Sequence, residues 1–370
     1  MNDVPGELQG EKRATDSRLP ALDGLRAISI VLVILGHLSG AHGFITLNMG
    51  IGDYAHLGVV VFFVISGFLI TTLLLAEERI HGRVSLKLFY ARRSLRIFPA
   101  AFAYLAVVGM LWTGGVIHLK TSDMMCAITY TMNYLPERSW QVGHLWSLSV
   151  EEQFYLVWPF AFAHLRPRNR VGTLAGVLLV AVLARLAARL FLEGTAYRNL
   201  EMFPMVADSL AAGCLLGIAR GWLESQSWYL RLLRPLPSIL ILLCVLVLNR
   251  YGAYTIDGVL GSTLINLGLA MLIHRCVLYS KGGFSQFLQR KPVAFVGVLS
   301  YSLYLWQQLF LNRNSGTWTN AFPQNLVFAV VAAAASYFLL EKPLMRFRTR
   351  LRMRSIACDS SLCVLAPIPR

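Results

Sequence analysis

The chain has little charge for its length, which argues against an ordinary soluble domain. Only 14% of its 370 residues are charged, whereas 56% are hydrophobic, and soluble domains keep about a quarter of their residues charged. Several apolar runs approach the roughly 20 residues that a helix needs to span a bilayer. The composition therefore predicts a polytopic membrane protein.

Cysteine and metal-binding patterns are scarce as well. The six cysteines show neither disulfide nor metal spacing, and no His, Cys or carboxylate cluster has the spacing of metal ligands. We therefore expect no metal and no bound cofactor. The residues before the first apolar run mix acids and bases and lack a cleavage site, which favours an uncleaved first helix over a signal peptide.

Acidic residues are outnumbered by basic ones, 19 to 34, which gives a formal net charge of +15. Such an excess can indicate nucleic-acid binding. Here, however, the basic residues lie between the apolar runs, where they act as topology signals. We therefore expect contact with membrane lipid and no nucleic-acid partner.

Ten apolar segments are predicted to cross the membrane, which makes the fold class an all-α polytopic bundle. If the N-terminus lies inside, most of the Lys and Arg residues fall on that side, so both termini are expected to be cytoplasmic. The expected spans are 27–47, 57–76, 97–117, 147–164, 171–191, 204–219, 236–249, 259–275, 292–311 and 324–341.

We expect one transmembrane domain, over residues 19–345. Residues 1–18 are interpreted as a cytoplasmic N-terminal segment, and residues 346–370 as a basic, disordered cytoplasmic tail. The sequence shows no internal repeat and no additional soluble domain.

The first apolar run, LDGLRAISIVLVILGHL (22–38), carries two ionisable residues, Arg26 and His37. Eleven residues end about 20° past three full helical turns, so both side chains share one face, about 16 Å apart. If the span begins near Ala27, Arg26 lies at the cytoplasmic edge and His37 near mid-membrane. Ionisable groups at that depth are functional candidates.

These two residue types suit proton chemistry on an anionic molecule. A neutral imidazole can take a proton from a hydroxyl, and an arginine is a permanent cation that binds phosphate or carboxylate. A plain structural alternative stays open, in which His37 hydrogen-bonds a neighbouring helix and Arg26 snorkels to the interface.

Three further stretches, together with the Arg26–His37 helix, resemble the acyltransferase-3 family of integral membrane acyltransferases. They are GVVVFFVISGFLI (58–70), FYARRSLRIFPA (89–100) and HLWSLSVEEQFYLVWP (144–159). Looser agreement follows in ADSLAAGCLLG (207–217), VGVLSYSLYLWQ (296–307) and LLEKPL (339–344). The resemblance covers about residues 18–345.

The resemblance implies O-acylation, often O-acetylation, of extracytoplasmic carbohydrates with a cytoplasmic acyl-CoA as donor. It also implies that His37 is the catalytic histidine and Arg26 its partner on the donor side. Many relatives have a histidine where this chain has Gln307, so we place no catalytic role at that position.

Arg92, Arg93 and Arg96 lie together at the inner end of the third expected span. Arg92 and Arg96 share a helix face at i,i+4 spacing, and arginine binds phosphate in a bidentate manner. We predict that the three residues bind acyl-CoA. Anchoring to anionic lipid headgroups is the alternative.

Two adjacent carboxylates, Glu151 and Glu152, open the fourth expected span. Ser149 and Glu152 have the spacing of a capping box, which is an adequate structural account. One carboxylate could also orient an imidazole or an acceptor hydroxyl. Of the two, we predict Glu152 as catalytic.

Three residues are assigned to the acceptor side. Arg185 lies deep in the fifth expected span and Asp208 near the start of the sixth, so an ion pair between them is expected. Tyr155 belongs to an interfacial aromatic group that could also stack on sugars.

These observations favour a multi-pass O-acyltransferase of the bacterial cytoplasmic (inner) membrane. It would move an acyl group, acetyl being favoured, from acyl-CoA to a carbohydrate or glycolipid such as O-antigen or exopolysaccharide. His37 would act as general base or accept the acyl group itself. The alternative is a secondary transporter or flippase of sugar-linked or acyl substrates, since mid-membrane His and Arg also mark transport paths.

Overall fold

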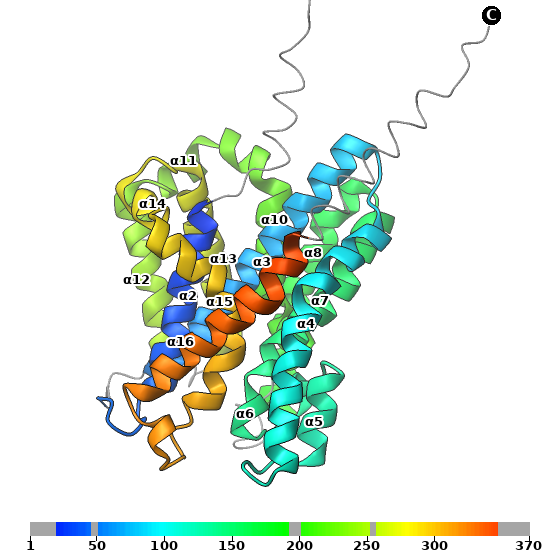
Figure 1. The fold of residues 1–370 in the computed structure, drawn as a ribbon. Helices are drawn as coiled ribbons and strands as arrows, with labels where there is room; N and C mark the ends of the chain where they lie inside the picture. Colours follow the sequence, from blue (N-terminus) through cyan, green and yellow to red (C-terminus); the bar gives the residue numbers. More distant parts are fainter. Residues whose placement is uncertain (1–19, 46–50, 192–200, 252–256, 347–370) are drawn as a thin grey trace, which may run out of the picture.

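The computed structural model describes residues 20–45, 51–191, 201–251 and 257–346, and within them it contains helices and connections but no strand (Figure 1). This confirms the all-α prediction. Short helices join the long ones: α5 (Thr121–Ile128), η1 (Met132–Tyr134), α6 (Trp140–Gly143), α11 (Ser227–Leu232), α14 (Gly283–Leu288) and η3 (Trp318–Asn320). The long helices are α2 (Pro20–Leu38), α3 (Ile51–His81), α4 (Leu86–Thr113), α7 (Leu145–His164), α8 (Pro167–Phe191), α10 (Phe203–Ser225), α12 (Pro235–Tyr251), α13 (Asp257–Leu278), α15 (Lys291–Phe310) and α16 (Gln324–Ser336), which continues into the π-helical turn η4 (Tyr337–Glu341).

Eight helices in the described ranges are long and apolar enough to cross a membrane, namely α2, α3, α4, α8, α10, α13, α15 and the helix that begins with α16. The other two expected spans, 147–164 and 236–249, correspond to α7 and α12. Helix α12 has only 17 residues, and α7 carries two glutamates and a glutamine within its length. The expected count of ten is therefore only partly met.

The first span lies further towards the N-terminus than expected. Instead of covering 27–47, α2 ends at Leu38, and the chain then turns through Gly40, which has a positive φ of 83°. Arg26 consequently lies within the helix and His37 lies in its last turn. The expected span 27–47 is therefore shifted towards the N-terminus, and the depth of His37 in the membrane stays a prediction.

The two ends of the described chain lie at the same end of the bundle. The start of α2 and the end of η4 both point towards the upper end of Figure 1. This arrangement agrees with an even number of crossings. The cytoplasmic location of the termini stays a prediction, and residues 1–18 and nearly all of 346–370 lie outside the described residues.

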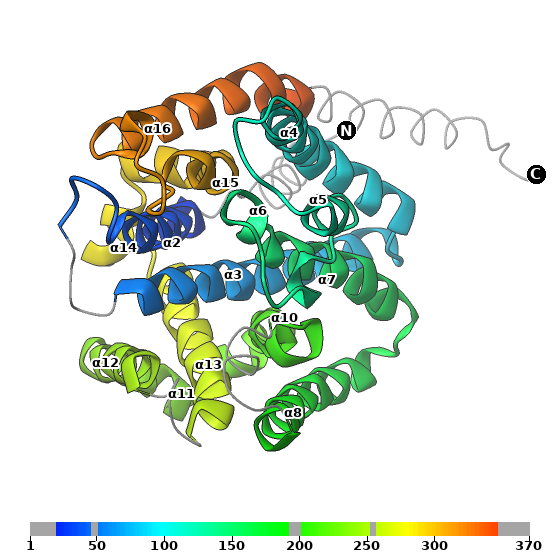
Figure 2. The same ribbon diagram turned by 90° about the horizontal axis from the view of Figure 1, so that it is seen from below.

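Helix α3 runs through the middle of the bundle, between α2 and α15 on one side and α10 and α13 on the other (Figure 2). Its crossing with α10 is made close by two glycines. A Cβ atom on Gly67 would lie 2.0 Å from the carbonyl oxygen of Leu210, and one on Gly213 would lie 2.1 Å from that of Val64. Small residues allow membrane helices to approach in this way. Only glycine fits at either position.

We expect Gly213→Ala to destabilise the protein by about 1–3 kcal/mol, because the added methyl group collides with the α3 backbone. The measurement is the temperature at which detergent-solubilised protein loses its monodisperse size-exclusion peak. Gly221→Ala on the same helix is the matched control, since a Cβ there meets nothing within 4 Å. Equal stability of the two variants would contradict this helix crossing.

Candidate active site

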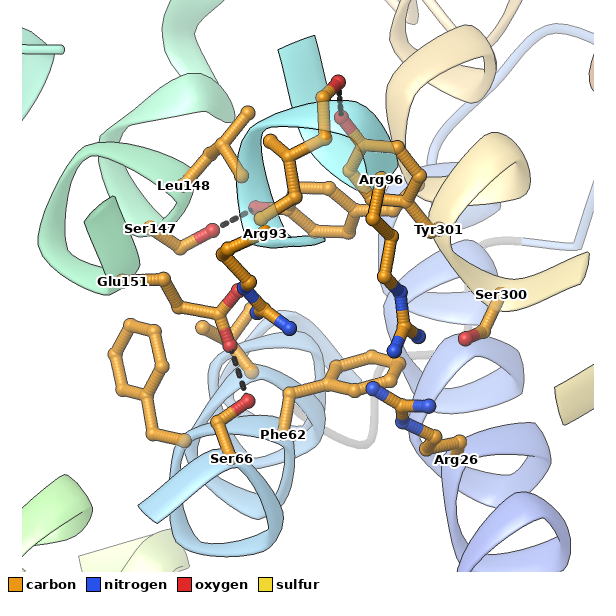
Figure 3. A pocket seen from close by; sticks show the side chains of 14 residues that line it. Arg26, Phe62, Ser66, Arg93, Arg96, Ser147, Leu148, Glu151, Ser300 and Tyr301 are labelled. Atoms are coloured by element: carbon orange, nitrogen blue, oxygen red, sulfur yellow. Dashed lines mark hydrogen bonds between the residues drawn. The ribbon is translucent and has the colours of Figure 1, made fainter. Parts of the chain in front are cut away.

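Three guanidinium groups converge on one cavity inside the bundle, which we call the arginine cavity (Figure 3). Arg26 comes from α2, whereas Arg93 and Arg96 come from α4. Helices α3, α7 and α15 complete its wall with Phe62, Ser66, Glu151, Ser300 and Tyr301. Residues far apart in the sequence therefore meet here, as the prediction for the donor side requires.

The residues that line the arginine cavity carry more positive than negative charge, which favours the binding of an anion. Glu151 is the carboxylate among the lining residues, and it accepts a hydrogen bond of 2.6 Å from Ser66 Oγ. The Nε atoms of Arg26 and Arg93 are buried with no hydrogen-bond partner among the described residues. Because guanidinium groups bind phosphate and carboxylate through paired hydrogen bonds, the cavity suits a phosphate-bearing ligand.

Arg92 is placed differently from the other two arginines of its cluster. It forms an ion pair of 2.8 Å with Glu77 and does not line the cavity. At about 100° per residue, Arg96 lies between Arg92 and Arg93 around the helix. Spacing alone therefore could not decide whether Arg92 or Arg93 lines the cavity together with Arg96. The ion pair with Glu77, near the end of α3, holds Arg92 outside the lining of the arginine cavity.

A second cavity, which we call the histidine cavity, surrounds the last turn of α2. It is lined by His37, His56, His144, Trp146 and Gln308, together with the Arg138–Glu201 ion pair of 2.6 Å. The rings of His56 and Trp146 stack with their planes 9° apart. Burial lowers the pKa of His144 to about 3, so this second histidine stays neutral.

His37 is held by contacts from two directions. Its Nδ1 atom lies 3.0 Å from Oε1 of Gln307 on α15. The ring also meets Trp140 edge to face, with centroids 5.6 Å apart, and the Trp140 Nε1–H donates to the carbonyl oxygen of Gln308. The imidazole is thereby fixed in position, with one ring nitrogen engaged.

The two cavities share two wall residues, Val59 of α3 and Tyr304 of α15. The Tyr304 hydroxyl donates to the backbone carbonyl of His144 at 2.7 Å and lies 2.5 Å from Ser147 Oγ. Arg26 and His37 therefore line adjoining cavities that share a wall at Val59 and Tyr304, which we call the partition. This is consistent with the prediction that both residues face the bundle interior.

The two glutamates of α7 are distinguished by position. Glu151 lines the arginine cavity, whereas Glu152 lines neither cavity and keeps one buried oxygen without a hydrogen-bond partner. Neither carboxylate contacts His37 among the hydrogen bonds of the described residues. The catalytic role of Glu152 stays a prediction. Of the two glutamates, Glu151 is the one that lines the arginine cavity.

The three residues assigned to the acceptor side lie away from the histidine cavity. The ring of Tyr155 lies beneath the Arg93 guanidinium, at 3.6 Å from its carbon to the ring centroid. Arg185 pairs with Asp208 at 2.9 Å, as expected, and also donates to Thr263 and to backbone carbonyls. This buried network joins α8, α10 and α13 and lines neither cavity, so its position indicates a structural role.

Several residues of the site were missed by the sequence analysis. Gln307 received no catalytic role, and Trp146 belongs to the same interfacial aromatic group as Tyr155, which could also stack on sugars. His56, Trp140 and Tyr304 were not singled out. Trp146 lies within HLWSLSVEEQFYLVWP, and Tyr304 and Gln307 lie within VGVLSYSLYLWQ, so the resemblance marked their stretches without marking the residues.

These observations define a helical bundle with candidate membrane-spanning helices, in which an arginine-lined cavity adjoins a histidine-lined cavity. Residues 19–340 match the acyltransferase 3 profile, described as an acyltransferase domain. The chain therefore belongs to the acyltransferase-3 family. This confirms the family resemblance.

Curated relatives include O-acetyltransferases of Staphylococcus aureus. "Putative O-acetyltransferase SACOL0978" of strain COL is 30% identical over 318 residues, which cover 78% of this chain and 50% of the relative. O-acetyltransferase OatA of strain NCTC 8325 / PS 47 is 28% identical over 371 residues, 91% of this chain and 58% of the relative. The chain thus spans about half the length of these relatives. No solved structure gives a significant match.

We expect Asp208→Asn to destabilise the fold by about 3–5 kcal/mol, because it leaves the buried Arg185 charge without its counterion. Thermal unfolding in detergent would measure the loss. Glu137→Gln is the control, since its ion pair with Lys120 is exposed and such pairs contribute about 0–1 kcal/mol. Normal stability of Asp208→Asn with loss of acceptor turnover would instead support the acceptor-side assignment.

Proposed function

We propose that this protein is a membrane O-acetyltransferase that uses a cytoplasmic acyl-CoA, with acetyl-CoA as the donor, and an extracytoplasmic carbohydrate acceptor. The observation that carries the proposal is the shared wall of the two cavities at Val59 and Tyr304. An anionic donor and a hydroxyl acceptor could each occupy one chamber and meet at this wall. The O-acetyltransferase names of the S. aureus relatives agree with this reaction.

The donor belongs in the arginine cavity. CoA carries several phosphates, and Arg26, Arg93 and Arg96 supply the cationic groups that would bind them. Arg26 lies nearer the start of α2, which the positive-inside pattern places on the cytoplasmic side. A thioester that extends from the bound phosphates towards Val59 and Tyr304 would bring its carbonyl to the partition.

The acceptor belongs in the histidine cavity, near the opposite end of α2. The stacked Trp146 and His56 rings offer a flat surface, and Arg138, Glu201 and Gln308 offer hydrogen-bonding groups. A pocket of aromatic surface with a few polar groups fixes the orientation of a bound ligand. These features suit a sugar ring with its hydroxyl directed at His37.

In the proposed reaction, Nε2 of His37 takes the proton of the acceptor hydroxyl as the oxygen attacks the thioester carbonyl. The new C–O bond forms as the C–S bond breaks, and the proton then passes to the CoA thiolate. The products are an O-acetylated sugar and CoA thiol. General base catalysis of this kind contributes about 10²–10⁴-fold.

We expect His37→Ala to abolish acetylation of surface glycans, because it removes the proposed base. Mass spectrometry of purified glycans should show a mass increment of one acetyl group with the wild-type gene, and none with the variant or without the gene. His118→Ala, at an exposed histidine outside both cavities, should retain the increment.

An increment that survives His37→Ala at normal protein level would overturn the assigned role of His37. If wild-type and gene-deleted cells gave identical glycans, and a flux assay showed substrate movement, the transporter alternative would be favoured instead.

We expect Arg93→Gln and Arg96→Gln each to raise the KM for acetyl-CoA about tenfold or more, since each removes a charged hydrogen-bond donor from the donor chamber. Initial rates of CoA-thiol release by purified protein would measure this change. Arg168→Gln, at an exposed site, serves as control. Arg92→Gln should change KM little, whereas an equal effect at Arg92 would favour the sequence-based assignment over the observed geometry.

A further inference from the structure

Gln307 contacts the ring of His37 at Nδ1 and is not among the residues that line either cavity. It is fully buried at the end of α15, and its Oε1 atom lies 3.0 Å from His37 Nδ1. Helix α15 is locked against α2, since a Cβ on Gly297 would lie 1.7 Å from the carbonyl oxygen of Asp23. The amide therefore cannot move away from the imidazole without separating two closely packed helices.

With Oε1 of Gln307 facing Nδ1, the amide accepts the hydrogen bond, and this arrangement assigns the proton of a neutral His37 to Nδ1. The lone pair is then on Nε2, which has no hydrogen-bond partner within the described ranges. His37 lines the histidine cavity. The contact thus selects the one neutral tautomer that can take a proton at Nε2.

The amide also keeps this contact free of negative charge. A carboxylate beside Nδ1 would stabilise the imidazolium strongly, whereas an uncharged amide oxygen does so less. The other charged or titratable groups around the ring are His56, His144, the Arg138–Glu201 pair and Arg313, which stacks over Trp140. Among these, the one carboxylate is already paired with an arginine.

We propose that Gln307 is a positioning residue that holds His37 in the Nδ1–H tautomer and so presents Nε2 as a base to the acceptor. The inference rests on the proposed function for its catalytic meaning, but the tautomer itself is a property of the resting protein. It gives the glutamine a specific task at a position where the family resemblance suggested none.

The direct test is ¹⁵N NMR of the full chain in detergent micelles with ¹⁵N-labelled histidine. Subtracting the spectrum of His37→Ala identifies His37 among the eight histidines. At pH 8 we expect a protonated Nδ1 and an unprotonated Nε2. In folded Gln307→Leu we expect the Nε2–H form to increase, while Gln324→Leu, at an exposed glutamine, should match wild type.

A wild-type spectrum with the proton on Nε2 would overturn the proposal, since the amide would then donate to Nδ1 instead of accepting from it. An unchanged tautomer in folded Gln307→Leu would overturn it as well. Because the wild-type measurement needs no variant, poor folding of Gln307→Leu does not prevent a decision.

Kinetics test the catalytic meaning in the same variants. With acetyl-CoA as donor and surface glycan as acceptor, Gln307→Leu should lower kcat about tenfold or more without changing the KM for acetyl-CoA. Gln307→Glu keeps an acceptor for Nδ1–H, so it should restore part of the rate. Its carboxylate favours the imidazolium, so the acid limb of the pH–rate profile should move to higher pH.

The outcomes separate this inference from the proposed function. Activity that persists in His37→Ala would contradict the proposed function and leave the tautomer assignment intact. An inactive His37→Ala together with full activity and an unshifted pH profile in both Gln307 variants would contradict only the role of Gln307.

Discussion

The close crossing of α3 with its neighbours is the constraint on which both cavities depend. Gly67 and Gly213 bring the backbones of α3 and α10 into contact, and the same helix carries Val59, Phe62 and Ser66 to the cavity walls. A bilayer gives apolar helices little reason to associate, so membrane helices rely on tight packing of this kind. The chemistry of the site is therefore held in place by glycines that contact neither cavity.

The second constraint is the free-energy cost of burying charged side chains inside an apolar helical bundle. Arg185 resolves it with hydrogen bonds from all three of its nitrogens, to Asp208, Thr263 and two backbone carbonyls. Arg170 forms an ion pair with Glu78 through both terminal nitrogens, although its Nε lacks a hydrogen-bond partner among the described residues. The arginine cavity leaves guanidinium nitrogens of Arg26 and Arg93 without protein partners. Arg26 and Arg93 form no ion pair among the described residues, whereas Arg185 and Arg170 each have a carboxylate partner. Because buried charged groups are normally paired, this difference supports the proposal that an anion binds in the arginine cavity.

The sequence predicted the helical fold class and the shared helix face of Arg26 and His37, because hydrophobic period and spacing are local properties. The family was predicted from the resemblance of four stretches of sequence. The sequence could not choose between Arg92 and Arg93, or between Glu151 and Glu152. In each pair the neighbours sit about 100° apart on one helix, and the decision depends on residues such as Glu77 and Ser66 from α3. The contact of Gln307 with His37 joins positions 270 residues apart, so it follows only from the packing of α15 on α2.

The partition between the cavities constrains how the proposed transfer can occur. If the phosphates of the donor stay with the arginines and the acceptor hydroxyl stays with His37, only the acyl end of the donor needs to reach Val59 and Tyr304. The hydroxyl of Tyr304 is held by His144 and Ser147, so the tyrosine forms a fixed wall and not a loose side chain. With this wall fixed, the proposed transfer depends on the acyl carbonyl and the acceptor hydroxyl meeting at Val59 and Tyr304, and not on movement of the two binding places towards each other.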